Sequence, residues 1–209
     1  VSYGYDAAGN RTQLTYPDGT TLDYAYDELN RLTQIREAEQ MIAEYVYDQV
    51  GRTVVRELQN GTYSTYNYDS SNRLLELVNR TSSAEIISSF AYTYDNVGNR
   101  ITMTTLEGVT HYAYDAIHQL TEVIYPDGSS TSYHLDPAGN RITEIVDGTT
   151  KDYTTNSLNQ YTAVDDDSYI YDDNGNLTSK VPPSGTTVYT YDFDNRLVQV
   201  DTITETITY

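Results

Sequence analysis

The chain contains no cysteine and no tryptophan, only two phenylalanines, and only 12 lysines and arginines among its 209 residues. Without cysteine, disulfide bonds, thiolate catalysis and cysteine-ligated metal sites are excluded. No apolar run approaches the roughly 18 residues that a membrane-spanning helix needs, and no signal peptide is recognisable, so we expect no membrane insertion. The 31 acidic residues give a formal charge of −19, which repels phosphate backbones and disfavours nucleic acid as a partner.

Tyrosine is abundant instead, with 23 residues, most of them in a recurring motif Tyr-x-Tyr-Asp-x-x-(Gly/Asn). Successive motif aspartates, or their stand-in, are 21, 21, 21, 26, 20, 21, 20, 16 and 20 residues apart. A period near 20 indicates a repeat architecture in which each unit buries its apolar face only against its neighbours. The aspartate position falls at Asp6, Asp27, Asp48, Asp69, Asp95, Asp115, Asp136, Asn156, Asp172 and Asp192.

One repeat, from Leu22 to Ile35, illustrates the expected local structure. Leu22, Tyr24 and Tyr26 alternate with other residues at the period of two that a half-buried strand shows. The aspartate then begins a turn, because its side chain bonds nearby amides and the following Gly or Asn tolerates positive φ. We therefore assign a structural role to the motif residues Tyr5, Asp6, Gly9, Tyr26, Asp27, Tyr47, Asp48, Gly51, Tyr68, Asp69, Tyr94, Asp95, Gly98, Tyr114, Asp115, Asp136, Gly139, Tyr171, Asp172, Gly175, Tyr191 and Asp192.

A second turn closes each unit. Pairs such as Asp18-Gly19 and Asn60-Gly61, lying between alternating runs, are the strongest short signal for a β-hairpin. The expected turn glycines are Gly19, Gly61, Gly108, Gly128, Gly148 and Gly185.

The repeats predict an all-β fold of about ten two-stranded hairpin units. Residues 1–209 are expected to form a single array, and an antiparallel sheet of this width should curl into a spiral. The 26-residue spacing predicts a longer loop around Thr81–Glu85. The 16-residue spacing after Asn156 predicts a distortion or a shortened hairpin. One arginine per repeat follows the aspartate by four or five residues, which suggests structural partners for carboxylates.

Three sharper functions were weighed against this structural interpretation. For catalysis, the carboxylates are identical turns repeated along the chain and three scattered histidines show no triad spacing, so we expect no enzymatic activity and no cofactor. Calcium has one weak candidate site, in Asp165, Asp166, Asp167, Asp172 and Asp173, because hard cations prefer clustered oxygens; two solvated acidic turns are the simpler interpretation. Tyrosine rows beside Asp and Asn are also compatible with saccharide or protein binding.

The motif resembles the YD repeat of bacterial Rhs polymorphic toxins, of insecticidal toxin-complex shell proteins and of teneurins. Residues 5–12 and 94–101 match its form Tyr-Asp-x-x-Gly-Asn-Arg-x-Thr closely, residues 26–33 match a shorter variant, and the resemblance covers essentially the whole chain. It implies a β-sheet wound into a hollow shell. In the bacterial proteins the shell encloses a C-terminal toxin, and in the teneurins it belongs to an adhesion receptor.

Relative to that family, ten repeats look too few to close a shell, and no toxin domain follows Tyr209. Asp136-Pro137-Ala138-Gly139 spells the family's autoproteolytic tetrapeptide, yet its register favours a plain turn. We therefore expect a fragment of a longer, secreted or cell-surface bacterial chain. Its expected function is a shell segment that encapsulates a toxin or other cargo, and the alternative is a carbohydrate- or protein-binding adhesion module. The expected partners are further repeats and the cargo, with glycans, a receptor or self-association through open sheet edges as alternatives.

Overall fold

The computed structural model describes all 209 residues and contains 21 β-strands and no helix. The all-β prediction is therefore confirmed. No segment forms a helix of the length and apolarity needed to cross a membrane. The chain divides into two compact units, Val1–Thr110 and His111–Tyr209.

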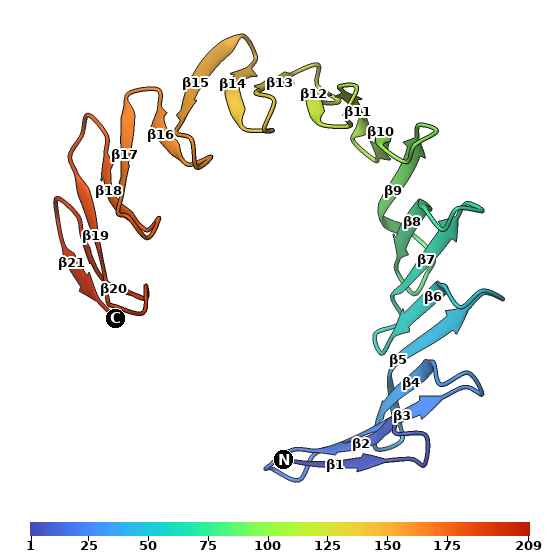
Figure 1. The fold of residues 1–209 in the computed structure, drawn as a ribbon. Coiled ribbons are helices and arrows are strands. Elements are labelled where there is room, and N and C mark those ends of the chain that lie inside the picture. Colours follow the sequence, from blue (N-terminus) through green and yellow to red (C-terminus); the bar gives the residue numbers. More distant parts are fainter. The chain divides into compact units, whose positions relative to one another are not determined.

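The first unit is an antiparallel meander in which each strand pairs with its neighbours in sequence. Figure 1 shows these strands side by side in a single layer. The strands are β1 (Ser2–Tyr5), β2 (Arg11–Thr15), β3 (Thr21–Tyr26), β4 (Leu32–Glu37), β5 (Gln40–Tyr47), β6 (Thr53–Leu58), β7 (Tyr63–Tyr68), β8 (Leu74–Arg80), β9 (Ile86–Tyr94) and β10 (Arg100–Thr105), followed by the start of β11 (Gly108–Tyr114).

The second unit continues from His111 with the same antiparallel order. Its remaining strands are β12 (Leu120–Ile124), β13 (Ser130–Leu135), β14 (Arg141–Val146), β15 (Thr149–Thr155), β16 (Tyr161–Val164), β17 (Asp167–Tyr171), β18 (Leu177–Val181), β19 (Thr187–Tyr191), β20 (Leu197–Asp201) and β21 (Thr206–Thr208).

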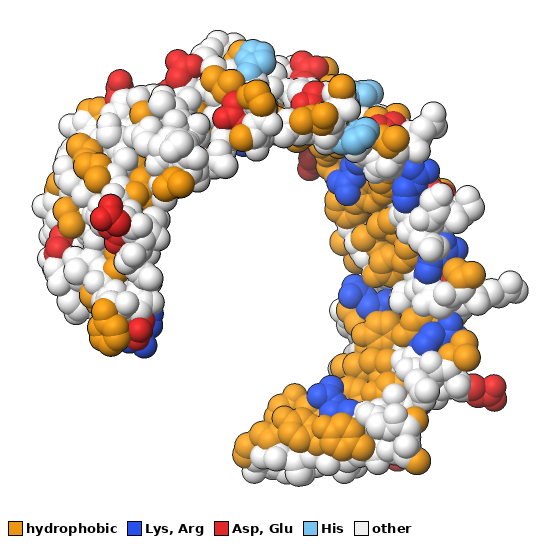
Figure 2. Space-filling model, viewed as in Figure 1, with side chains coloured by type: hydrophobic (Ala, Val, Ile, Leu, Met, Phe, Trp, Pro, Cys, Tyr) orange, Lys and Arg blue, Asp and Glu red, His pale blue; other side chains and the backbone are white.

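Alternation along the strands gives each unit two different faces. In β3, Leu22, Tyr24 and Tyr26 are half-buried while Asp23 and Ala25 are exposed. We call the side that carries the motif tyrosines the tyrosine face. Figure 2 shows hydrophobic side chains gathered in a band over the strands of the first unit, with Lys and Arg side chains beside it.

Little of either sheet is deeply buried. The buried apolar residues are Leu14, Ala43, Val78 and Val123, and no side chain falls below 2% exposure. A single-layer sheet has no second layer to cover its apolar side, so each repeat is stabilised mainly by contact with the repeats before and after it.

The two irregular spacings are resolved differently. The extra residues between Asp69 and Asp95 lengthen strands β8 and β9 to seven and nine residues. The turn from Thr81 to Glu85 closes with the same bonds as the other turns, Thr81 N to Glu85 O and Ala84 N to Thr81 O. The predicted longer loop is therefore wrong, because added residues that continue the ladder gain hydrogen bonds that a loop would not provide.

The short spacing after Asn156 gives a shortened hairpin, the second of the two predicted alternatives. The Asn156 turn itself is regular, with Asn156 N bonded to Gln160 O at 2.9 Å. The shortening falls on β16, which has four residues, and on the two-residue connection from Val164 to Asp167. The hairpin is therefore shortened while the asparagine turn is not distorted.

Candidate functional site

The repeated motif turn is held by the aspartate and its own backbone. In the second repeat, Asp27 N donates to Arg31 O and Asn30 N donates to Asp27 O, both at 3.0 Å. One carboxylate oxygen of Asp27 accepts bonds from the amides of Leu29 and Arg31 at 2.9 and 3.0 Å. Because one acceptor satisfies two amides within four residues, the turn is specified locally.

All ten turns place a residue with positive φ three positions after the aspartate or its stand-in. Glycine occupies five of these positions and asparagine four, the residues that adopt this conformation most readily. The remaining position is His118, with φ 68°. The ten residues are Gly9, Asn30, Gly51, Asn72, Gly98, His118, Gly139, Asn159, Gly175 and Asn195.

The tyrosine that precedes the aspartate reaches back to the previous hairpin. Each motif hairpin contains a register shift beside this position, as between Ala25 and Tyr26; Leu135 and Thr155 occupy the position in two repeats. The hydroxyl of Tyr47 donates at 2.6 Å to the carbonyl of Leu32, the residue paired with Tyr26. A bulge disturbs the backbone ladder, and here the next repeat's hydroxyl bonds the adjoining carbonyl. The same bond is made by Tyr26 to Arg11, Tyr68 to Thr53, Tyr94 to Leu74 and Tyr171 to Tyr161.

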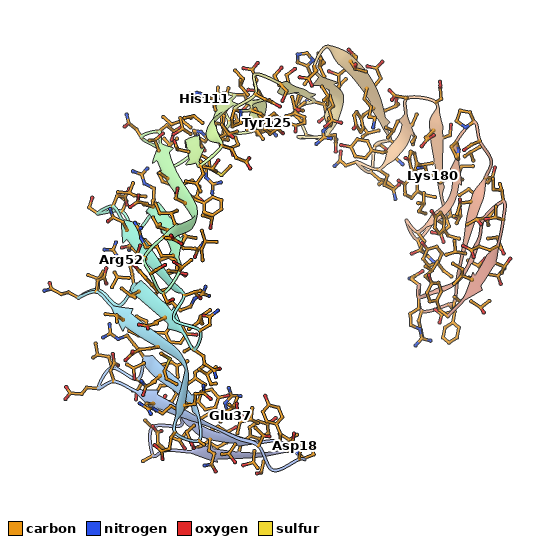
Figure 3. All side chains as sticks on the ribbon, turned by 180° about the vertical axis from the view of Figure 1, so that it is seen from behind. Asp18, Glu37, Arg52, His111, Tyr125 and Lys180 are labelled. Atoms are coloured by element: carbon orange, nitrogen blue, oxygen red, sulfur yellow. The ribbon has the colours of Figure 1, made fainter.

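Arginine four residues after the aspartate joins one repeat to the next. Arg52, labelled in Figure 3, donates from Nε to the Asp48 carboxylate at 2.6 Å. Its Nη1 donates to Asp69 O at 2.9 Å and to Asn72 Oδ1 at 3.0 Å in the following turn. Its guanidinium lies 4.8 Å from the ring centroid of Tyr68. We call this arrangement the arginine clamp; Arg31 and Arg73 form it with Tyr47 and Tyr94.

Asparagine takes the arginine's place in a second form of the turn. Asn10 Nδ2 donates to the Asp6 carboxylate at 2.9 Å and to Asn30 Oδ1 of the next turn at 2.8 Å. Asn140 and Asn176 make the equivalent pairs of bonds. A short amide therefore also links successive turns, without charge.

Where an arginine follows the asparagine, it stands one residue later than in the clamp and stacks on the first tyrosine of a repeat motif. Arg11 lies 4.5 Å from the Tyr24 ring, and Arg141 lies 4.7 Å from the Tyr133 ring. The prediction that the arginines partner carboxylates is confirmed for Arg31, Arg52 and Arg73, and for Arg141, whose partner is Glu144 and not the motif aspartate. It is wrong for Arg11, whose Nε is buried without a hydrogen-bond partner. The asparagine side chain already donates a hydrogen bond to the motif carboxylate, so the guanidinium packs against the tyrosine rings.

The tyrosine rows contact arginine more than one another. Tyr153 and Tyr161 form a ring pair, with centroids 5.3 Å apart. The first tyrosine of a pair lies opposite a central residue of the neighbouring strand, such as Ile35 opposite Tyr24. Aliphatic side chains and guanidinium groups therefore lie between the tyrosine rings of successive repeats, an arrangement that the sequence periodicity did not predict.

The turn bonds shift the acidity of both motif groups. Hydrogen bonds from the Arg31 amide and then its side chain hold the pKa of Asp27 below its ordinary value of 3.8. In Asp6 the Asn10 side chain is the largest cause of the lowered pKa. Burial raises the pKa of the Tyr47 and Tyr68 hydroxyls above 10.0. Both shifts stabilise the charge states present at neutral pH: ionised aspartate and neutral tyrosine.

The second set of turns also uses positive φ. Gly19, Gly61, Gly128 and Gly148 have φ between 76° and 89°, while Gly108 and Gly185 have φ of 135°. At Gly61 an added Cβ would lie 2.8 Å from Ser82 Cβ, so both conformation and space exclude a side chain there.

The acidic stretch considered for calcium is dispersed. Asp165 accepts a bond from the Asp152 amide at 2.7 Å, and Asp167 pairs with Lys180 at 3.0 Å. Asp172 is occupied by its own turn, with bonds from the amides of Asn174 and Asn176. No three acidic or histidine side chains come together in a group that could hold a metal ion. The structure does not bring the five candidate residues into one site.

The three histidines lie on different strands and turns. His134 Nδ1 lies 2.7 Å from Thr143 Oγ1 in the neighbouring strand, and His118 occupies a motif turn. His111, labelled in Figure 3, begins the second unit.

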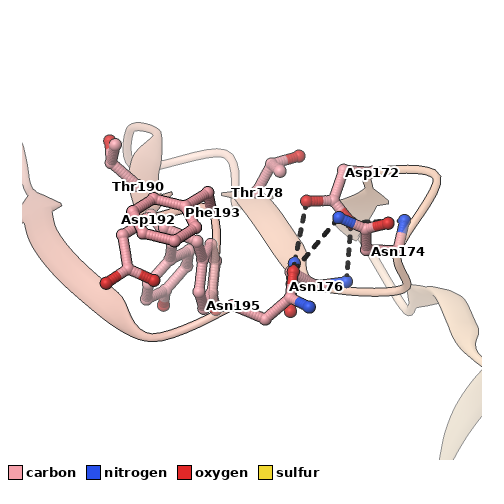
Figure 4. A pocket seen from close by; sticks show the side chains of 10 residues that line it. Asp172, Asn174, Asn176, Thr178, Thr190, Asp192, Phe193 and Asn195 are labelled. Carbon is pink, nitrogen blue, oxygen red and sulfur yellow. Dashed lines mark hydrogen bonds between the residues drawn. The ribbon is translucent and has the colours of Figure 1, made fainter.

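One open groove in the second unit combines amide and aromatic groups (Figure 4). It has a volume of about 390 Å³ and lies between the Asp172 turn and the Asp192 turn. Asn195 Oδ1 accepts bonds from Asn174 and Asn176 at 3.1 and 2.8 Å. Phe193 borders the groove with 92% of its surface exposed. The motif analysis did not single out Phe193, although a large apolar residue inside a turn was a visible signal.

Comparison with known proteins supplies the family. The RHS Repeat model matches residues 5–40, 114–151 and 171–206, which together make up more than half of the chain. The tRNA nuclease WapA of Bacillus subtilis is 38% identical over 91 residues, covering 42% of this chain and 4% of that protein. The tRNA3(Ser)-specific nuclease WapA of Bacillus spizizenii is 37% identical, with the same two shares.

The structural likeness extends along nearly the whole chain. The TcdB2-TccC3 crystal structure covers 99% of this chain and 14% of its own, with a TM-score of 0.67 and 18% identity. The Photorhabdus luminescens Tc holotoxin pore covers 99% and 14%, with a TM-score of 0.66 and 17% identity. This chain thus corresponds to a small part of the proteins it matches, and the likeness to the solved structures is one of fold. Its motif turns, its antiparallel hairpins and the match to the family model establish that this chain belongs to the RHS-repeat family.

Proposed function

We propose that this chain is a segment of an encapsulating wall, which separates a further part of its parent polypeptide from the surroundings. The observation that carries the proposal is the tyrosine face. It is a wide, half-buried aromatic and aliphatic surface on a single-layer sheet. Exposed apolar surface of this extent is typical of a side that contacts another polypeptide.

The wall would act sterically, and the arginine clamps are the parts that keep it closed. Each clamp bonds one turn to the next through a carboxylate, a backbone carbonyl and a ring. Openings between neighbouring hairpins would require these bonds to break together. The backbone ladder supplies the rest of the continuity, since strands 4.8 Å apart leave no passage for a folded or extended chain.

We propose no catalytic role for this segment. Its motif carboxylates are held by bonds in their own turns; Asp27 and Asp48, for example, each accept three. A carboxylate occupied in this way is poorly placed to exchange a proton with a substrate. The nuclease activity named for WapA belongs to that whole protein, of which the matched stretch is 4%.

The test is limited digestion with proteinase K of the parent polypeptide, compared with its enclosed part produced alone. The enclosed part should survive at least tenfold longer in the parent. A parent carrying Arg31→Met, Arg52→Met and Arg73→Met together should lose most of this protection. Arg36→Met and Arg80→Met, whose side chains bond carbonyls within their own hairpins, provide the matched control. Equal digestion rates in the parent and in isolation would refute the proposal.

Secretion or exposure at the bacterial cell surface is part of the same proposal and is supported by resemblance alone. Fractionation of the producing cells, followed by detection of this segment, tests it. Recovery exclusively in the cytoplasm would contradict it.

The groove beside Phe193 favours a second candidate, a saccharide-binding surface. An exposed ring can stack on a sugar, and the nearby amides of Asn174, Asn176 and Asn195 offer hydrogen bonds. Binding of a panel of bacterial and host glycans to the chain, with Phe193→Ala as the variant, tests this candidate. If no glycan binds, or if Phe193→Ala binds as well as the wild-type chain, the groove is not a saccharide-binding site.

A further inference from the structure

The residue opposite the first tyrosine of each repeat motif lies at the centre of the tyrosine face, and we call it the central position. It is apolar in seven of the ten repeats and charged in three. The apolar residues are Leu14, Ile35, Leu77, Met103, Val123, Val164 and Val200, and the charged ones are Arg56, Glu144 and Lys180.

Two of the three charges are compensated inside the chain. Glu144 accepts from Arg141 at 3.2 Å and from the Tyr153 hydroxyl at 2.8 Å. Lys180, labelled in Figure 3, pairs with Asp167 at 3.0 Å. Charged groups on an apolar surface are retained where a partner satisfies them, because partial loss of water is otherwise costly.

Arg56 is the third charge, and the chain provides no counter-ion for it. Its one hydrogen bond runs from Nη2 to Ser64 Oγ at 3.3 Å, and its Nε is buried without a partner. Ser64 in turn donates to Asn79 Oδ1 at 2.7 Å, so it offers no negative charge. A guanidinium has five N–H donors, so most of those on Arg56 remain unused.

The comparison with Lys180 shows what is missing. Asp167, which neutralises Lys180, lies five residues before its motif aspartate Asp172. In the repeat of Arg56 the equivalent residue, five before Asp48, is Ala43, which is 4% exposed. The same central position is thus filled by a cation twice, once with a carboxylate beside it and once with a methyl group.

We infer that Arg56 binds a carboxylate from a polypeptide segment that lies on the tyrosine face of the first unit. The inference rests on the proposed function, which places another part of the parent polypeptide against this face. It adds the chemistry of recognition: an acidic side chain flanked by apolar residues, which would contact the neighbouring Tyr45. The pair would be strengthened by the low polarity of the surroundings.

The experiment is a titration of the 209-residue chain, labelled with ¹⁵N, at low salt with two peptides. The probe is acetyl-Val-Glu-Val-amide, and its uncharged match is acetyl-Val-Gln-Val-amide. The Arg56 Nε–H resonance should shift when the Glu peptide is added. The Glu peptide should also bind about fivefold more tightly than the Gln peptide, the difference expected from one partly exposed charge pair. Equal binding of the two peptides to the wild-type chain would overturn the inference.

Three variants identify the residue responsible. Arg56→Met should abolish the preference without loss of stability, because seven repeats carry an apolar residue at this position. Ala43→Asp should also abolish it by supplying the internal carboxylate that Lys180 has. Arg36→Met, a control whose arginine bonds Gln34 and the Glu39 carbonyl, should keep it. A preference that survives in Arg56→Met would assign the binding elsewhere and refute the proposal.

The result is separable from the wall proposal. Protease protection in the parent polypeptide tests the wall, and it should persist in Arg56→Met because one contact is lost from a large surface. Protection without peptide discrimination would leave the wall proposal standing and reject the Arg56 site. Discrimination without protection would reject the wall while retaining a carboxylate site on this face.

Discussion

Replacement of Arg52 by methionine should weaken the contact between the third and fourth repeats. The variant loses an ion pair to Asp48 between side chains that are 27% and 21% exposed, together with bonds to Asp69 O and Asn72. It also loses the position over the Tyr68 ring. The ion pair contributes about 0.5 kcal/mol after screening, the ring contact about 0.5–1 kcal/mol, and the two bonds about 1 kcal/mol together. The free energy of unfolding should therefore fall by about 2 kcal/mol.

Urea denaturation followed by far-UV circular dichroism measures this change, with the slope of the transition checked for constancy. Arg36→Met is the matched control, since this arginine bonds only within its own hairpin, and it should cost about 0.5 kcal/mol or less. A double-mutant cycle of Arg52→Met with Tyr68→Leu should give a coupling of about 0.5–1 kcal/mol. An Arg52→Met effect no larger than that of Arg36→Met would refute the clamp.

Three further predictions concern the turns and the tyrosine hydroxyls. Tyr47→Phe leaves the bulge carbonyl without its donor and should cost about 1 kcal/mol in urea denaturation, whereas Tyr45→Phe should cost almost nothing; equal effects would contradict the bulge role. Gly98→Ala, at φ 101°, should lower the free energy of unfolding by about 1 kcal/mol and the thermal midpoint with it, whereas Ala38→Gly, at φ 51°, should raise both. Because the folded pKa of Asp27 is lowered, the stability it confers is present above its ordinary pKa of 3.8 and is lost as the pH falls through the folded pKa. In acid denaturation, the free energy of unfolding should therefore fall less steeply with falling pH in Asp27→Asn than in the wild-type chain. An identical pH dependence of the two proteins would contradict this assignment.

The hydroxyl pKa shifts give the opposite dependence at alkaline pH. A raised folded pKa for Tyr47 means that its contribution is complete below 10.0 and is lost as the pH rises through the folded value. Alkaline unfolding can be monitored by tyrosinate absorbance at about 295 nm. In Tyr47→Phe it should begin at a higher pH than the stability of this variant at neutral pH implies. A transition that shifts only with overall stability would contradict this expectation.

The sequence alone determined the hairpins, their turns and their order. The reason is that turn chemistry is local: Asp27 bonds amides two and four residues away, and Asn30 supplies the positive φ beside them. Alternation along Leu22, Tyr24 and Tyr26 likewise assigns a face without knowledge of any other strand. Where only spacing was available, as at Thr81–Glu85, the prediction placed the extra residues in a loop instead of in the strands.

Only the tertiary structure decided which groups meet across the strands. Each bulge shifts the register, and that shift brings the Tyr47 hydroxyl to a carbonyl 15 residues earlier and the Arg52 guanidinium onto the following tyrosine. The same register leaves Arg56 opposite Tyr45 with Ala43 where a carboxylate stands beside Lys180. Such contacts join residues of different hairpins, so they depend on how the strands align and not on the composition of any one repeat.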